Sequence, residues 1–153
     1  MVLGNYFPDD IKNNYINKHP HIYDVYRYYN EIAEKTKLII IIAEYKDNIS
    51  HSFAYCFINS EINCNIYPSD SQYIKFHKPI FVLNNPYLDH DSYVNCNEIY
   101  EVEKKHIDNE LHTDIGIYLG RMNKSDFNEI IQNIKNNQSI LRKIKKKYNL
   151  FHP

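Results

Sequence analysis

The sequence has few of the residues that several common classes of site require. It has only three glycines and no GxGxxG or GxxxxGK pattern, which excludes the glycine-rich loops that hold dinucleotides and nucleoside triphosphates. Its three cysteines, Cys56, Cys64 and Cys96, show no CxxC spacing, so we expect neither a zinc ribbon nor a disulfide framework. Unpaired thiols are typical of a reducing compartment, and we therefore expect a cytoplasmic protein.

Long apolar segments are also lacking. The longest uninterrupted apolar run, Leu38 to Ala43, is far shorter than the roughly 20 residues of a membrane helix. Met1 to Asp10 has two acids and a proline in place of the apolar centre of a signal peptide. We therefore expect no membrane segment and no leader. Because the formal net charge is −1, nucleic-acid binding would need a local basic patch.

What remains is an ordinary globular composition. With 43% apolar and 24% charged residues, the 153-residue chain has enough apolar matter for a core and is not typical of a disordered chain. It is too short for two ordinary domains, and we expect a single domain spanning residues 1–153.

Hydrophobic spacing predicts a helix near the N-terminus. Apolar side chains recur three and four residues apart within residues 20–36, as on one face of an amphipathic helix, and Pro20 suits a first helical turn. The residues of this face are Ile22, Val25, Tyr26, Tyr29, Ile32 and Ala33. The β-branched run 37–45 predicts a buried strand, and 51–59 predicts its antiparallel partner after a turn at Asp47-Asn48.

Further short strands are expected at 72–76, 79–83, 92–94 and 98–103, with Pro79 at a strand start or a sheet edge. The C-terminal third has helical periodicity from Phe127 to about Tyr148, with Asn123 or Ser125 as the N-cap. Asn136-Asn137 weakens its middle, which indicates two helices with a joint there. The order of elements predicts an α+β fold, a small antiparallel β-sheet or SH3-like barrel with an N-terminal helix and a C-terminal helix.

Two motifs in residues 92–134 resemble those of MazF/PemK-like toxins. The run SYVNCNEI at 92–99 is similar to that family's strand S-[FY]-V-x-C-x-x-I, and LGRM at 119–122 is similar to its step into the last helix. The N-terminal half departs from the family, because lysines stand at 35–37 where an arginine-proline step is expected. Lys18-His19-Pro20-His21 resembles the ToxN-like toxins, which share the fold and are neutralised by RNA.

The resemblance implies a metal-independent endoribonuclease, the toxin of a toxin–antitoxin system, that uses no cofactor. Such enzymes cleave single-stranded RNA by attack of a 2′-hydroxyl on its own phosphate, which requires a base, an acid and a cation to stabilise charge. Its expected partners are an RNA substrate and a cognate antitoxin of protein or RNA, and a homodimer is possible. A non-catalytic MazF-like binding module of a mobile element is the alternative that the missing arginine favours.

Seven residues are the candidates for this chemistry. Lys37 supplies the stabilising cation, Ser60 stands at the family's Thr/Ser position and can hold a phosphate oxygen, and His21 is the preferred imidazole. The candidates for RNA binding are Lys35, Lys18, His19 and His51. Solvated strand ends and ordinary surface histidines would explain the same residues without any function.

Two other features have competing interpretations. Asp89-His90-Asp91 and His112-Thr113-Asp114 carry metal-ligand residue types, and a metal hydrolase is the third functional hypothesis. Adjacent loop residues rarely point at one ion, however, and turn formation explains Asp89 and Asp91. The basic run 142–147 could track phosphates, or it could be the solvated end of a helix whose cations complement the dipole.

Overall fold

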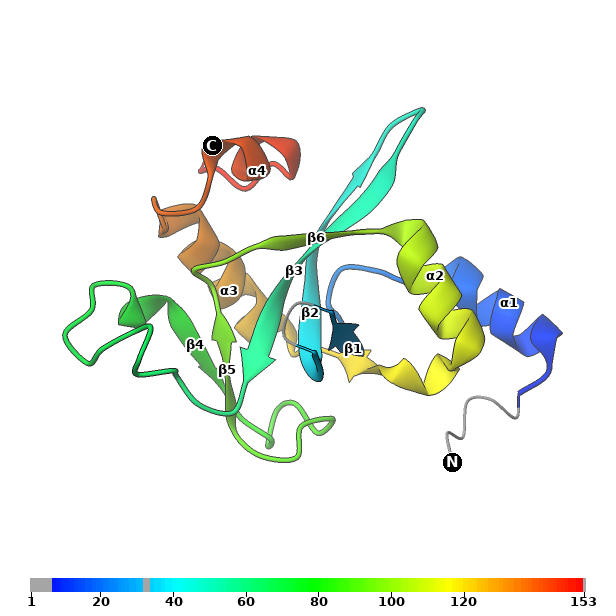
Figure 1. Cartoon of the computed structure of the whole chain (residues 1–153), viewed down its shortest axis with the longest axis horizontal. Coiled ribbons are helices and arrows are strands. Elements are labelled where there is room, and N and C mark those ends of the chain that lie inside the picture. Colours follow the sequence, from blue (N-terminus) through cyan, green and yellow to red (C-terminus); the bar gives the residue numbers. More distant parts are fainter. Residues whose placement is uncertain (1–6, 32–33, 153) are drawn as a thin grey trace.

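The β-branched run forms one strand of a long hairpin. The computed structural model describes residues 7–31 and 34–152. Within it, β2 (Lys35–Lys46) and β3 (His51–Asn59) pair antiparallel, as the sequence predicts. The Asp47 carboxylate closes the turn by accepting hydrogen bonds from the backbone N–H groups of Ile49 and Ser50, at 2.8 and 2.7 Å. This hairpin is the centre of the sheet (Figure 1).

Five shorter strands complete a seven-stranded antiparallel sheet in the order β4-β5-β3-β2-β1-β7, with β6 also paired to β3. They are β1 (Asp24–Asn30), β4 (His77–Ile80), β5 (Ser92–Asn95), β6 (Tyr100–Glu103) and β7 (Tyr118–Arg121). β5 pairs with the end of β3 and β6 with its beginning, so the predicted strands at 92–94 and 98–103 lie along one edge of β3. Pro79 lies in the edge strand β4, where its missing N–H does not interrupt the hydrogen bonding between central strands.

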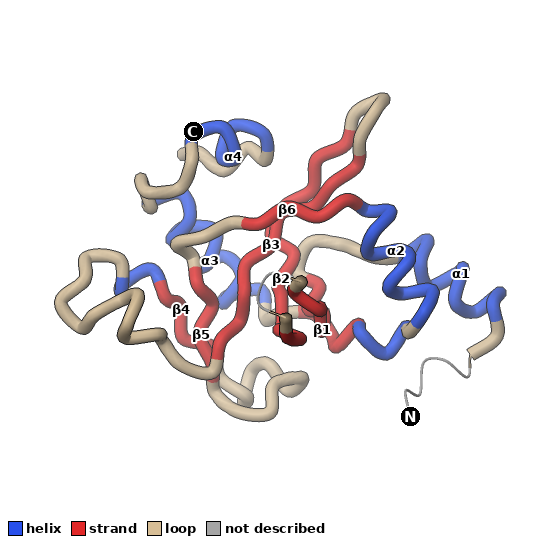
Figure 2. The backbone as a smooth tube through the Cα atoms, in the orientation of Figure 1, coloured by secondary structure: helices blue, strands red, loops and turns tan. Residues whose placement is uncertain are grey.

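Helices cover both faces of the sheet. Figure 2 shows α3 and α4 on one side and α1 and α2 on the other. Their bounds are α1 Asp9–Lys18, α2 Lys104–Thr113, α3 Lys124–Asn136 and α4 Arg142–Lys147, with short 3₁₀ turns at Ile74–Phe76 and Ile115–Ile117. Because side chains alternate along a strand, Ile40 and Ile42 join one core cluster and Ile39 and Ile41 the other. β2 is therefore buried on both faces, which explains its continuous apolar run.

The predicted helix at 20–36 is wrong. Residues 24–30 form β1, which pairs with β2 on one side and β7 on the other. Val25, Tyr26 and Tyr29 have aromatic or β-branched side chains that suit a strand, and their spacing fits both periods over so short a segment. Ile32 and Ala33, also assigned to that helix, lie outside the described residues. The N-terminal helix occurs instead as α1, upstream of Pro20.

The remaining differences are smaller. The strands expected at 72–76 and 79–83 become a 3₁₀ turn followed by β4, and α2 was not predicted. The C-terminal helices are confirmed, with the joint after Asn136 and with Asn123 as the N-cap, accepting from the Asp126 N–H at 3.2 Å. The α+β class with a small antiparallel sheet is likewise confirmed. Across residues 7–31 and 34–152, no helix is both long and apolar enough to cross a membrane.

Candidate active site

One cleft of about 710 Å³ opens where the beginning of β2 and the end of β3 meet the loops that follow β3 and β4. Three cations line it, Arg27, Lys35 and Lys37, together with three carboxylates, Glu61, Asp89 and Glu98. Imidazoles, hydroxyls and aromatic rings complete the lining. The cleft therefore combines positive charge with groups able to take up and release protons, and it is not simply a basic groove.

Lys37 is held in a defined position within this cleft. It lies on β2 beside the end of β3, and its Nζ donates a hydrogen bond to Asn59 Oδ1 at 3.3 Å. The same Nζ lies 4.7 Å from the centre of the Phe57 ring, within the range of a cation–π contact. Among the described residues no carboxylate comes within ion-pair distance of it. Lys37 therefore presents a positioned ammonium whose charge is not neutralised by a direct partner.

The surroundings of Lys37 weaken its hold on the proton. Burial lowers the pKa of its ammonium, and the positive charge of Lys35, two residues away on the same face of β2, lowers it further. The negative charge of Glu98 acts in the opposite direction. An ammonium of this kind still attracts an anion such as a phosphate, and it gives up a proton more readily than a fully solvated lysine.

Three of the predicted site residues come together in the cleft. Lys35 and Lys37 enter from β2, and Ser60 follows directly after the last residue of β3. Lys35 and Ser60 are exposed, so both can reach a bound molecule. The hairpin register places the beginning of β2 beside the end of β3, which brings together residues more than twenty positions apart in the chain.

His21 does not lie in this cleft. It lines a second pocket, of about 420 Å³, on the face of the sheet that carries α3 and α4. There it lies among largely apolar residues such as Ile42 and Phe127. His21 is far from Lys37 because residues 24–30 form the strand β1 and not the expected helix. This extended segment carries the chain away from residue 21 before β2 begins.

The other predicted RNA-binding residues also lie outside the cleft lining. His19 Nδ1 lies 2.8 Å from the buried carboxylate of Asp24, and its ring packs on Tyr118. His51 lies at the opposite end of β3 from Ser60 and pairs with Glu44. Lys18 is exposed at the end of α1. His19 has a structural contact that ties the segment before β1 to the sheet.

Sequence reasoning missed His77, the imidazole that does line the cleft. It is only 7% exposed, and no described residue bonds its buried Nε2 atom. Its ring meets the edge of Tyr67 at 4.5 Å, and its cross-strand neighbour is Asn95. Burial lowers the pKa of His77, although Glu98 opposes this, so the ring is neutral at pH 7. No local sequence pattern identifies His77 as a site residue, because it reaches the cleft only through the strand order β4-β5-β3.

Sequence reasoning also missed Glu98 and Tyr100. The Tyr100 hydroxyl donates a hydrogen bond to Glu98 Oε2 at 2.6 Å, and both residues line the cleft. Burial and this bond raise the pKa of Tyr100 well above its usual range, so its phenol keeps its proton and remains a donor. The alternation predicted for 98–103 places the two side chains on one face, and this signal could have identified the pair.

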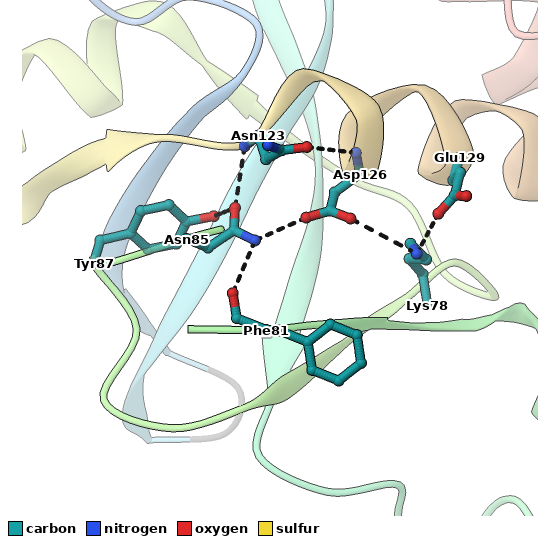
Figure 3. Close-up of polar contacts among 7 residues, drawn as sticks. All are labelled: Lys78, Phe81, Asn85, Tyr87, Asn123, Asp126 and Glu129. Carbon is teal, nitrogen blue, oxygen red and sulfur yellow. Dashed lines mark hydrogen bonds and ion pairs between the residues drawn. The ribbon is translucent and has the colours of Figure 1, made fainter. Parts of the chain in front are cut away.

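One wall of the cleft is fixed by a buried amide. Asn85, which is fully buried, donates to the Phe81 carbonyl at 3.2 Å and to Asp126 Oδ2 at 2.8 Å (Figure 3). Its Oδ1 accepts from the Tyr87 hydroxyl at 2.9 Å and from the Asn123 N–H at 3.0 Å. Asn85 thus attaches the loop after β4, which contributes Tyr87 to the cleft, to the N-terminus of α3.

In the part of the chain that the structure describes, no three side chains of the metal-ligating types His, Cys, Asp and Glu gather around one point. Asp91 Oδ1 instead accepts a hydrogen bond from the Val82 N–H at 2.9 Å, and His90 Nδ1 lies 3.3 Å from Ser92 Oγ. Asp91 therefore joins the two ends of the loop between β4 and β5, a longer-range bond than the local turn bond expected of it. Neither a protein-family model nor a curated protein matches this chain.

Proposed function

We propose that this protein is an endoribonuclease that cleaves single-stranded RNA in the cleft without a metal ion. The observation that carries the proposal is the convergence of Lys35 and Lys37 from β2 and of Ser60, just after β3, on one cleft that also holds proton-transfer groups. The likeness of residues 92–134 to MazF/PemK-like toxins supports the same reaction.

The cleft supplies the groups that such a cleavage requires. The Lys37 ammonium stabilises the extra negative charge that develops on the phosphate as the 2′-hydroxyl attacks, and its partial burial strengthens that interaction. Lys35 attracts the neighbouring phosphates, and the Ser60 hydroxyl donates to a phosphate oxygen. The products are a 2′,3′-cyclic phosphate and a new 5′-hydroxyl, so the reaction consumes no water in this step.

Aromatic side chains in the same cleft suit an unpaired RNA. Tyr67, Tyr87 and Tyr100 line it and are each partly exposed. Bases of single-stranded nucleic acids stack on such rings, each contributing about 1–3 kcal/mol. A double helix would hide its bases from these rings, which favours single-stranded RNA as the substrate.

The wider proposal is that the cleavage serves a toxin neutralised by a cognate antitoxin, protein or RNA. Expression without an antitoxin should then arrest bacterial growth, and Lys37→Ala should relieve the arrest at equal protein level. Arrest that persists in the cleavage-deficient variant would contradict a nuclease toxin.

The direct test is cleavage of a long RNA transcript by the purified protein in excess EDTA. We expect discrete fragments with cyclic phosphate ends. Lys37→Ala and Ser60→Ala should each slow cleavage at least about tenfold, equivalent to about 1.4 kcal/mol of transition-state stabilisation. Lys46→Ala, at the far end of β2, is the matched control and should cleave as the wild type does. RNA binding without any cleavage would instead favour the non-catalytic module.

A further inference from the structure

We propose that Glu98 is the general base of this cleft and that Tyr100 positions its carboxylate. This inference rests on the proposed ribonuclease function and assigns the group that accepts the proton of the attacking 2′-hydroxyl. Neither residue is among the sequence-predicted candidates.

A chain of contacts fixes Glu98 relative to the phosphate-binding lysine. Tyr100, which holds Glu98 Oε2, packs its ring 4.7 Å from the Phe57 ring and stacks on Tyr55 at 5.6 Å. Phe57 is also the ring on which the Lys37 ammonium lies. The buried Phe57 ring therefore fixes the positions of both groups: Lys37 contacts it directly, and Glu98 is held by Tyr100, which packs on it.

Glu98 and Lys37 act on each other without being in contact. The negative charge of Glu98 opposes the lowering of the Lys37 pKa, and among the described residues the two side chains form no ion pair. Apart from Tyr100, no described residue hydrogen-bonds the Glu98 carboxylate, so Oε1 is available. Both side chains line the same cleft of about 710 Å³, which offers a bound ribose and its phosphate an acceptor and a cation.

His77 is a weaker candidate for the same role, although it is the neutral imidazole of the cleft. Its Nε2 atom is closed off from solvent, and the Tyr67 ring lies against it. A 2′-hydroxyl must come within about 3 Å of the base that deprotonates it. Glu98 is exposed and lines the cleft, so a 2′-hydroxyl can approach its carboxylate, whereas the Nε2 atom of His77 is buried.

In the proposed step Glu98 accepts one proton and Lys37 donates one. The 2′-hydroxyl gives its proton to Glu98 as the bond from the 2′-oxygen to phosphorus forms. The bond from phosphorus to the 5′-oxygen breaks, and the departing oxygen takes a proton from the Lys37 ammonium. After the products leave, Glu98 loses its proton to water and Lys37 regains one from water, so no further reactant is needed.

The test compares Glu98→Gln with Glu103→Gln, an exposed carboxylate at the far end of β6 that does not line the cleft. Cleavage is followed with a fluorescently labelled single-stranded RNA of random sequence, and binding with its 2′-O-methyl form, which lacks the attacking hydroxyl. Glu98→Gln should lower kcat by at least about 100-fold, the usual contribution of a general base. It should bind the analogue as tightly as the wild type or more tightly, because a charge that repels phosphate is removed. Glu103→Gln should cleave normally.

Tyr100→Phe keeps the aromatic packing and removes only the hydroxyl. It should lower kcat with little change in KM, and it should have no further effect in a Glu98→Gln background, because Tyr100 acts through that carboxylate.

Glu98→Gln that cleaves as fast as the wild type, or that loses binding in step with cleavage, would overturn the inference. A wild-type protein that cleaves no RNA would refute the proposed function itself, so the two failures are distinguishable.

Discussion

Replacing Asn85 with alanine should destabilise the protein more than any ordinary loop substitution. The Asn85 amide uses both donors and two acceptor positions in four hydrogen bonds, two within its own loop and two to the start of α3. Removing it leaves the Asn123 N–H and the Phe81 carbonyl without these partners, at a position that is fully buried. It also releases the Asp126 carboxylate, whose remaining partner among the described residues is the Lys78 ammonium at 3.7 Å (Figure 3).

The expected loss of unfolding free energy follows from the four hydrogen bonds of the Asn85 side chain. Each neutral hydrogen bond contributes about 1 kcal/mol net, and the bond to the charged Asp126 contributes about 1.5–3 kcal/mol. Partial rehydration of Tyr87, which is partly exposed, recovers some of this sum. We therefore expect Asn85→Ala to lower the free energy of unfolding by about 3–5 kcal/mol, a large part of the roughly 5–15 kcal/mol that stabilises a typical domain.

Urea unfolding followed by circular dichroism measures this loss. The matched control is Asn84→Ala, because Asn84 is exposed in the same loop and no described residue bonds its side chain. It should change stability by no more than about 0.5 kcal/mol. A loss below about 1 kcal/mol for Asn85→Ala would refute the reasoning, since it would mean that the network does not hold the loop to α3.

Two further predictions concern titration. Because folding lowers the pKa of His77, the unfolded chain binds its proton first, and stability should fall as the pH drops below the ordinary histidine value of 6.5. His77→Phe should therefore lose less Tm between pH 7 and pH 5 than the wild type does, and equal losses would contradict this. Folding also lowers the pKa of Lys37, so its protonated form costs stability at pH 7, and this cost fades as the pH rises toward 10.5. Lys37→Met should unfold at a higher urea concentration than the wild type at pH 7, with the gap narrowing at alkaline pH; Lys46→Met is the control.

The sequence determined the elements whose signals are local and strong. The β-branched run at 37–45 has no competing period, and it became β2; the Asp47 turn and the strand at 51–59 followed. Asn123 and Asn136-Asn137 marked the beginning and end of α3, because capping and helix ending depend on groups within a single turn. Lys35 and Lys37 stand at the beginning of the same strand, and because side chains alternate along it they share one face of β2.

Tertiary structure decided the elements whose local signals were ambiguous. Residues 20–36 carry a spacing that suits a helix, yet hydrogen bonding to β2 and β7 makes 24–30 a strand. A strand draws its stability from neighbours far away in the sequence, and a short segment does not show whether those neighbours exist.

The candidate site also contains some residues that the sequence could indicate and others that only the tertiary structure brings to the cleft. Lys37 and Ser60 were selected through the resemblance to MazF/PemK-like toxins, and a single hairpin register then brings the two residues together. Glu98 and His77 reach the cleft only because β5 lies between β3 and β4 and because the chain bends from β5 into β6. Which strands become neighbours depends on packing across the whole sheet, and that packing, not any local pattern, placed a carboxylate and an imidazole near the lysine.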